Sequence, residues 1–315
     1  MNQSKKIADG ALFTAIFIIL IVIAIFVPGA LLVLMFVLPL PFIIYTYRYD
    51  WKAALIMFAA TILFSLLFAS IVSLPLTVVT GLGGMMIGTA VHRKLSAYET
   101  LGRGILGYIA GLLFIYLFVV VFLNVNLVQE IDMMMEESIE ISQGIMAEFG
   151  LPELTEEELE PITAQLSMVK DLIPVGIAIL SMVIAFISQW LSYKFLNRFE
   201  KTQLYFPLFR NLRLPVAIIW VYFISLIIML MDLDPSSSIY LVINNVLSLV
   251  GILIVLQGLS FLFFMTHQKK WPKAIPVIGV LLTLFLPYLF MNLVRIIGII
   301  DVGFGIRDRY LNEKK

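Results

Sequence analysis

The sequence contains no cysteine and only two histidines, His92 and His267. The absence of cysteine excludes disulfides, thiolate metal sites and cysteine nucleophiles. Two histidines are too few for a histidine metal cluster, so we expect no metal and no cofactor. Charged residues make up 13% of the 315 residues, about half the share typical of soluble domains. The net charge of zero provides no overall basic field, so we expect no nucleic-acid partner.

Long apolar runs fill most of the chain, which is 61% hydrophobic with a mean hydropathy of +1.03. About 20 apolar helical residues cross a hydrocarbon core roughly 30 Å thick. The sequence therefore predicts an all-α fold, a polytopic transmembrane helical bundle of eight or nine spans in a lipid bilayer. The expected spans are Ala11–Val27, Ala30–Tyr45, Trp51–Leu74, Leu76–Val91, Gly104–Leu123, Leu172–Tyr193, Leu214–Met231, Ile239–Met265 and Ala274–Ile300.

The first apolar run, 11–45, contains no Asp, Glu, Lys or Arg. It continues past Pro28-Gly29, so we expect a retained first span and not a cleaved signal peptide. Proline removes a backbone donor and glycine permits a sharp bend, so this dipeptide is expected to separate the first two spans. Pro39 and Pro41 make the second span short or irregular.

Basic residues indicate the orientation, because Lys and Arg concentrate on cytoplasmic loops. We predict a multi-pass protein of the cell membrane with a cytoplasmic N-terminus, because most bases then fall on inner segments. Nine spans would place a basic C-terminal tail outside, against this rule. Either the last run folds back near Pro287, or one early span is wrong. The tail bases are Arg307, Arg309, Lys314 and Lys315.

Residues 124–171 form the one long interruption of the apolar pattern, and they are strongly acidic with Lys170 as their only base. Apolar residues recur near the helical period on both sides of Gly150-Leu151-Pro152. We predict an extramembrane acidic helical hairpin that is extracytoplasmic and packed on the outer mouth of the bundle. The alternatives are a lid over an outward cavity and a docking surface. Glu156-Glu157-Glu158 points in three directions on a helix, so it forms no metal site.

Small residues four positions apart indicate close helix packing. Gly84 and Gly88 form one such pair and Gly107 and Gly111 another, so we expect a tight hairpin of the two spans that carry them. Ala11 and Ala15 have the same spacing on the first span. That pair is consistent with intramolecular packing or with a docking face for another membrane protein.

Polar residues within apolar runs are costly in lipid and therefore indicate function or pairing. Arg295 is the only strong base well inside such a run; it could snorkel, pair with Asp301, or serve as a substrate counter-ion. If a substrate pocket exists, the residues that we expect to line it are Asn244, Gln257, Asn292 and Arg295. No nucleophile–base motif and no paired intramembrane carboxylates appear, so we expect no catalytic residues and no enzyme activity.

Four segments carry a resemblance to the YybS-like family of bacterial polytopic membrane proteins, over essentially the whole chain. They are the opening Gly10-Ala11-Leu12-Phe13-Thr14-Ala15, the entry Leu172-Ile173-Pro174 after the acidic insertion, the basic loop 194–213, and the ending Gly298-Ile299-Ile300-Asp301 with Phe304 and Arg307. None of these segments is a catalytic signature. The resemblance thus implies a family and no reaction.

The N-terminal half also resembles the substrate-binding subunits (S-components) of energy-coupling-factor vitamin transporters, and the rod-shape protein MreD. In those transporters an Ala-x-x-x-Ala face on the first helix docks the coupling subunit, and Ala11 and Ala15 stand at the matching place. The resemblance implies small-molecule binding for uptake. This chain is longer than those subunits and shows no vitamin-pocket signature, so a membrane scaffold or partner-docking protein in envelope or signalling assemblies is the alternative.

Together these features predict three regions. Residues 1–123 are expected to form five membrane helices with an S-component-like arrangement. Residues 124–171 are expected to form the acidic helical insertion, and residues 172–315 the remaining membrane helices and a short basic tail. The expected partners are the bilayer, a membrane protein bound through the first helix, and a small-molecule ligand.

Overall fold

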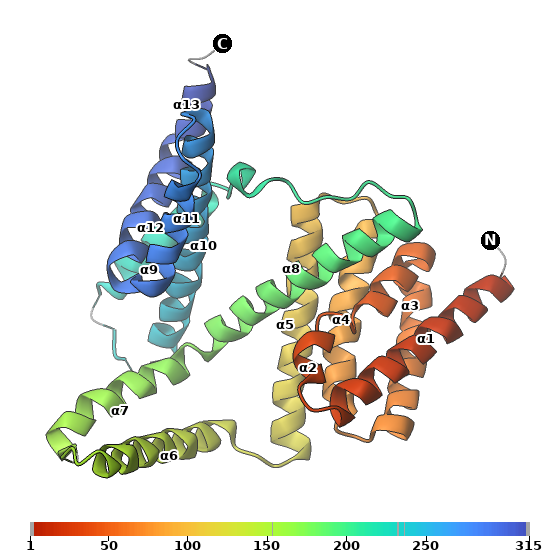
Figure 1. The fold of residues 1–315 in the computed structure, drawn as a ribbon, viewed down its shortest axis with the longest axis horizontal. Coiled ribbons are helices and arrows are strands. Elements are labelled where there is room, and N and C mark those ends of the chain that lie inside the picture. The colour runs from red at the N-terminus through yellow and green to blue at the C-terminus, as the bar shows by residue number, and fades with distance from the viewer. Residues whose placement is uncertain (1–2, 153, 232, 236, 313–315) are drawn as a thin grey trace. The chain divides into compact units, whose positions relative to one another are not determined.

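The computed structural model of the protein describes residues 3–152, 154–231, 233–235 and 237–312, and Lys314 and Lys315 of the tail lie outside them. The described residues form helices joined by turns and loops (Figure 1). The helices are α1 (Gln3–Phe26), α2 (Ala30–Leu34), α3 (Leu40–Ala69), α4 (Ser73–His92), α5 (Ala97–Phe122), α6 (Leu127–Glu148), α7 (Glu156–Asp171), α8 (Ile173–Phe199), η1 (Phe209–Asn211), α9 (Ala217–Met229), α10 (Ser238–Gln268), α11 (Ala274–Phe285), α12 (Pro287–Phe304) and α13 (Ile306–Asn312).

Apolar helices long enough to cross a bilayer confirm the predicted polytopic helical bundle. Among the described residues, seven helices meet the length and hydropathy required of a membrane span, and α9 and α11 are shorter apolar helices. The chain divides into two compact units, residues 1–206 and 207–315. Helix α8 packs against α5 and so lies in unit 1, whereas the sequence assigned everything from residue 172 onward to the C-terminal membrane region.

The first apolar run of unit 1 bends where the sequence predicts. Gly29 has a φ of +77°, and the chain turns there from α1 into the short helix α2. Pro39 precedes α3, which is itself interrupted at Asp50, where φ is 66° and ψ is 170°. The 30-residue helix α3 is thus two segments that run in different directions, in agreement with the separate spans expected on either side of residue 50.

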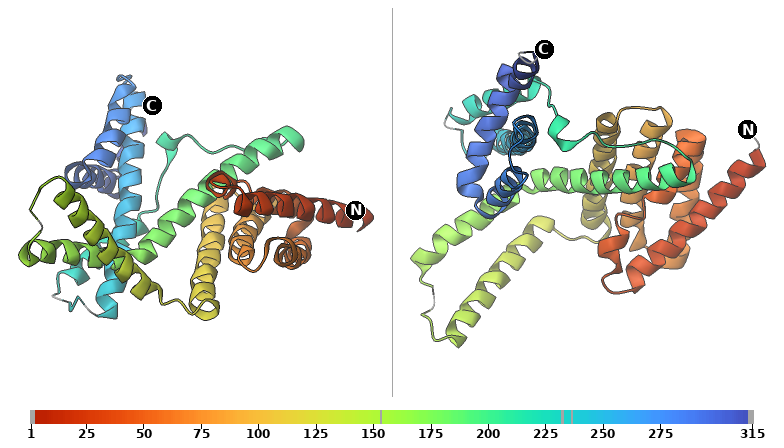
Figure 2. Two further views of the ribbon diagram at one scale, coloured as in Figure 1. Left: turned by 60° about the horizontal axis from the view of Figure 1, so that its bottom comes forward. Right: turned by 45° about the horizontal axis from the view of Figure 1, so that its top comes forward.

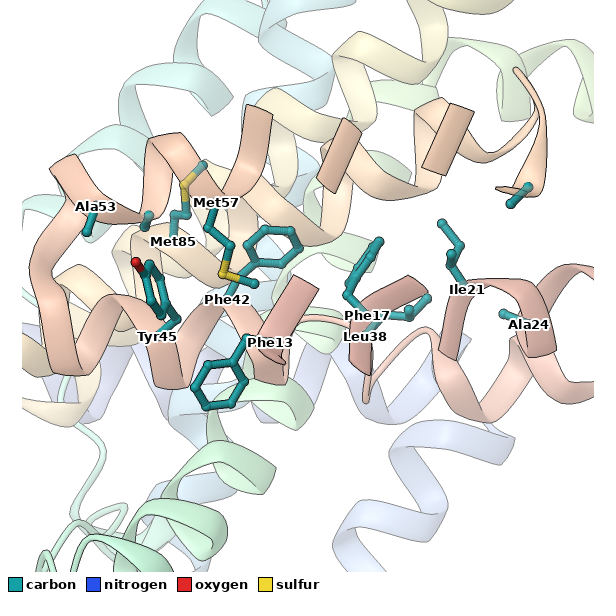
Figure 3. Packing of buried hydrophobic residues seen from close by; sticks show 12 residues of the cluster. Phe13, Phe17, Ile21, Ala24, Leu38, Phe42, Tyr45, Ala53, Met57 and Met85 are labelled. Atoms are coloured by element: carbon teal, nitrogen blue, oxygen red, sulfur yellow. The ribbon is translucent and has the colours of Figure 1, made fainter. Parts of the chain in front are cut away.

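Aromatic side chains fill the interface between α1 and α3. The rings of Phe17 and Phe42 meet edge to face with centroids 5.1 Å apart, and both side chains are fully buried (Figure 3). Tyr45, before the interruption at Asp50, and Met57, after it, belong to the same cluster, so both segments of α3 pack against α1. Edge-to-face pairs of this kind add about 0.5–1.5 kcal/mol to the effect of burial. This packing positions α1 on the bundle.

The predicted glycine pairs both lie at helix contacts, but against different partners. An added Cβ at Gly111 would lie 2.6 Å from the Cα of Val79, so this glycine permits the close α4–α5 hairpin. An added Cβ at Gly88 would instead lie 2.7 Å from the carbonyl oxygen of Ile43 on α3. Gly107 accordingly faces α4 as Gly111 does, and Gly84 faces α3 as Gly88 does. Helix α4 is therefore held on two sides.

The acidic segment forms the predicted helical hairpin. Helices α6 and α7 meet at a joint that contains Gly150, whose φ is +69° (Figure 2). Lys170 forms an ion pair with Asp132 across the hairpin. At the start of α7, the backbone N–H and the hydroxyl of Thr155 both donate to the carboxylate of Glu158 at 2.9 Å. The hairpin packs on itself, and α7 contacts α8.

Unit 2 folds back at Pro287. The sequence offered this fold-back as one of two ways to reconcile the basic C-terminal tail with the charge rule. Pro287 begins α12, and the preceding residue departs from helical geometry. Arg295 lies against Gly251 on α10, and further along the chain the ring of Tyr310 meets Phe264. The later residue, Tyr310, contacts the later position on α10, Phe264, so α12 and α13 run parallel to α10. The C-terminal helix therefore lies at the end of unit 2 where α10 ends.

Candidate functional site

An apolar groove runs along α1 on the side that faces the second segment of α3. It encloses about 740 Å³, and Ala11 and Ala15 are exposed within its lining. From Gln3 to Ile19 the groove follows α1 for about 24 Å, at 1.5 Å of rise per residue. This length approaches the thickness of a hydrocarbon core. The opposite wall comes from α3 and includes Ala60 and Phe64. We call this hollow the α1–α3 groove.

A cluster of charged side chains joins three helices at one end of unit 1. Arg48 on α3 donates from Nη1 to Asp9 Oδ2 of α1 at 2.9 Å and from Nε to Glu200 Oε1, directly after α8, at 2.8 Å. The hydroxyl of Tyr49 donates to the same oxygen of Asp9 at 2.8 Å. Here α1 begins, α4 ends at His92 and α8 ends, and we call it the basic end.

A polar cavity of about 740 Å³ opens at the basic end. Its charged lining comprises Lys5, Arg48 and Lys94 against the carboxylates of Asp9 and Glu200. The ring of His92 also lines the cavity, and its Nδ1 lies 2.7 Å from the carbonyl oxygen of Tyr47. A carbonyl only accepts hydrogen bonds, so Nδ1 carries a proton and Nε2 is left for another contact.

Unit 2 contains a buried ion pair between Asp301 and Arg307, which are only 4% and 3% exposed. Arg307 Nη2 lies 2.8 Å from Asp301 Oδ2, and Gln257 Nε2 donates to the same oxygen at 2.5 Å. The other amide atom of Gln257, Oε1, accepts from the backbone N–H of Leu214 at 3.0 Å. Asp301 therefore pairs with Arg307, and the proposed pairing with Arg295 is wrong.

The guanidinium of Arg307 also holds the loop before α9. Its Nη1 donates to the carbonyl oxygens of Arg210 and Leu212 at 2.8 and 3.0 Å, and its Nη2 donates to the hydroxyl of Ser260 at 3.2 Å. The ring of Phe264 lies 5.2 Å from the guanidinium carbon. Its Nε also donates to Asp301 Oδ1 at 3.1 Å. With the ion pair to Oδ2, five acceptor contacts satisfy the buried cation. This network therefore serves stability and connects the loop with α10, α12 and α13.

The four expected substrate-binding residues lie in unit 2, but they do not converge on one site. The amide of Gln257 is held on both sides in the ion-pair network. Arg295 Nη1 lies 3.4 Å from both the hydroxyl of Tyr222 and Oδ1 of Asn292, while its buried Nε has no partner among the described residues. Asn292 is exposed, and Asn244 is half-buried. None of the four lines the groove or the cavity described above.

Sequence reasoning missed the Asp9–Arg48–Glu200 cluster and the partner of Asp301. A signal for the first existed, since Asp9 and Arg48 are charged residues that flank a long uncharged run. Two antiparallel spans joined by the bend at Gly29 bring its ends together. The signal for the second was weaker. Asp301 and Arg307 are six positions apart, and the helix break at Gly305 between them prevents a helical-spacing argument.

Comparison with known proteins assigns the family. The model of a family of predicted membrane proteins, DUF2232, matches residues 15–302. The chain belongs to the DUF2232 family of predicted membrane proteins. The uncharacterised protein YybS of Bacillus subtilis (strain 168) is 29% identical over 309 residues, which cover 98% of this chain and 99% of that protein. This likeness confirms the YybS-like resemblance. No solved structure matches the chain.

Proposed function

We propose that this DUF2232 protein is a non-enzymatic membrane scaffold that docks a transmembrane helix of another membrane protein in the α1–α3 groove. The observation that carries the proposal is the exposure of Ala11 and Ala15 along a groove of about 24 Å. Small residues four apart let a second helix backbone approach closely, and membrane helices associate through such packing. The resemblance to energy-coupling-factor S-components supports the same face as a docking surface.

A helix fits the groove better than a flexible chain does. The groove follows the axis of α1, and both walls are helical, so a third helix would lie alongside them over most of the bilayer thickness. Its lining is apolar along the bilayer depth and ends near Gln3 and Lys6. The matching partner is a helix with small residues on one face and an acidic or polar group at the end that meets Lys6.

Site-specific cross-linking tests this proposal in cells. A photo-cross-linking residue at Ala15 should capture one transmembrane segment of a different protein, and the double substitution Ala11→Leu/Ala15→Leu, made with the cross-linker moved to Ile19, should abolish that product. Ala59→Leu on the exposed surface of α3 is the matched control, since this residue is exposed and lies outside the groove lining. Cross-links to lipid alone, or to a second copy of this chain, would refute docking of another protein.

Small-molecule binding for uptake is the second candidate function, and Arg295 supports it. Its buried Nε has no hydrogen-bond partner among the described residues, although a buried donor without a partner is costly. An anionic or acceptor-bearing ligand that contacts Arg295 and its neighbour Asn292 would satisfy this group. Uptake of the ligand should then be lost in Arg295→Met and Asn292→Ala with expression intact. Normal uptake in both variants would exclude these residues as the site.

For the orientation, we propose a cytoplasmic N-terminus and an extracytoplasmic hairpin at 124–171 in the cell membrane. The clustering of Lys5, Arg48 and Lys94 at the basic end supports this assignment, because bases concentrate on the cytoplasmic side. In unit 2, the fold-back at Pro287 places Arg307 and Arg309 at the end where the basic segment after α10 begins. With this fold-back, the basic tail no longer conflicts with the charge rule.

A further inference from the structure

A second apolar hollow in unit 1 shares two residues with the polar cavity. This hollow encloses about 390 Å³ and is bordered by α1, the first segment of α3 and α8. Arg48 and Glu200 line both this apolar hollow and the polar cavity. The two spaces are therefore adjacent, with the ion pair at the boundary. One is polar and lies at the basic end, whereas the other is apolar and extends along the helices.

The polar part is suited to an anion. Asp9 and Glu200 are both engaged by Arg48, so the two carboxylates and one guanidinium form a closed cluster. Lys5 and Lys94 line the cavity outside these bonds, and both are exposed and available to an incoming group.

The apolar part is suited to an alkyl chain. It is lined by side chains from α1, α3 and α8, including Phe13, Ile16 and Leu20 of α1 and Phe195 and Phe199 of α8. From Phe13 to Leu20 it follows α1 for about 10 Å. Ile16, Phe195 and Phe199 are partly exposed, so the hollow opens sideways. A chain could enter it from the bilayer without crossing water.

We propose that unit 1 binds an anionic phospholipid, with the phosphate group in the polar cavity and one acyl chain in the apolar hollow between α1 and α8. The juxtaposition of the two hollows at Arg48 and Glu200 carries this inference, because only an amphiphile uses both. Basic pockets between membrane helices on the cytoplasmic side bind anionic headgroups. This site lies on another side of α1 from the α1–α3 groove, and it does not depend on the docking proposal.

Native mass spectrometry of the full-length protein in mild detergent tests the assignment. The probes are dioleoyl phosphatidylglycerol, dioleoyl phosphatidylcholine and free glycerol 3-phosphate. We expect the wild-type protein to prefer phosphatidylglycerol over phosphatidylcholine by at least tenfold. Removing one cation near a headgroup weakens binding about fivefold, so Lys5→Gln/Lys94→Gln should weaken phosphatidylglycerol about 25-fold. The control Lys52→Gln/Lys194→Gln has the same charge change outside the cavity lining and should bind as wild type.

A second variant tests the chain-binding part. Ile16→Trp fills the apolar hollow and should weaken phosphatidylglycerol at least tenfold, while Leu113→Trp, on the exposed surface of α5, should have no effect. Circular dichroism confirms that each variant is folded before binding is compared. Equal binding of the two lipids, or wild-type binding by both the Lys5/Lys94 and the Ile16 variants, would overturn the proposal. Glycerol 3-phosphate that binds as tightly as the lipid would assign the cavity to a soluble phosphate compound and also overturn it.

Discussion

Removal of Arg307 should destabilise unit 2 more than the removal of any exposed base. In Arg307→Met, the carboxylate of Asp301 stays buried and charged without its ion-pair partner, and the carbonyl oxygens of Arg210 and Leu212 lose their donor. Breaking a buried ion pair from one side costs about 3–5 kcal/mol. Gln257 keeps one hydrogen bond to Asp301 in the variant, so we expect a loss near the lower end of this range.

The assay is thermal unfolding of the purified protein in detergent, with Arg309→Met as the matched control. Arg309 is exposed on α13, two residues from Arg307, so its loss should change the free energy of unfolding by less than about 0.5 kcal/mol. The double variant Asp301→Leu/Arg307→Met removes both charges, and it should recover much of the stability, because a well-packed apolar pair can replace a buried ion pair.

Two results would refute this reasoning. The first is an Arg307→Met variant that is no less stable than Arg309→Met, which would show that the ion pair does not stabilise unit 2. The second is a double variant that is less stable than Arg307→Met alone by the full effect of a second independent loss, which would show that the two residues do not interact.

Three further predictions concern orientation, packing and pH. Since the chain has no cysteine, single cysteines can be introduced directly. A membrane-impermeant thiol reagent on intact cells should label Ser142→Cys but not Arg309→Cys. The reverse labelling pattern would show that the orientation is opposite to the one proposed. Gly258→Ala places a Cβ 2.1 Å from a backbone oxygen of α12 and should destabilise the protein by about 1–3 kcal/mol in thermal unfolding, whereas Gly176→Ala, with open space around it, should not. Hydrogen bonds from the backbone and the hydroxyl of Thr155 lower the pKa of Glu158 below its ordinary 4.5. The contribution of Glu158 to the stability of α7 is therefore present above pH 4.5 and is lost as the pH falls through the lowered pKa. Amide exchange of α7, corrected for intrinsic rates, should show this loss, and Glu158→Gln should remove the pH dependence.

Helices and bends were predictable here because they depend on local chemistry. The turn at Gly29 requires a residue that tolerates positive φ, and the break before α3 follows from Pro39, which cannot donate a backbone hydrogen bond. The separation of α11 and α12 at Pro287 was likewise visible as one of two explanations. Each of these features follows from a few adjacent residues.

Partners across long sequence separations were not predictable in the same way. Arg48 and Glu200 are 152 residues apart, and nothing local indicates that α8 returns to α3. Gly84 and Gly88 show that a helix packs closely somewhere, but the spacing does not identify α3 as the partner in place of α5. The sequence offers Asp301 as one of several possible interactions of Arg295, whereas the fold brings Arg307 onto that carboxylate.

Helix α1 connects the two proposals for unit 1. One side of it carries Ala11 and Ala15 along the α1–α3 groove, and Phe13 and Ile16 line the apolar hollow next to α8. Asp9 fixes the beginning of the helix through Arg48. A headgroup beside Lys5 and Asp9 would therefore contact the same helix end that positions the docking alanines. Because α1 is one rigid element, occupancy of the lipid site and docking of a partner helix would act on a shared structure, and the lipid environment could then influence which partner binds.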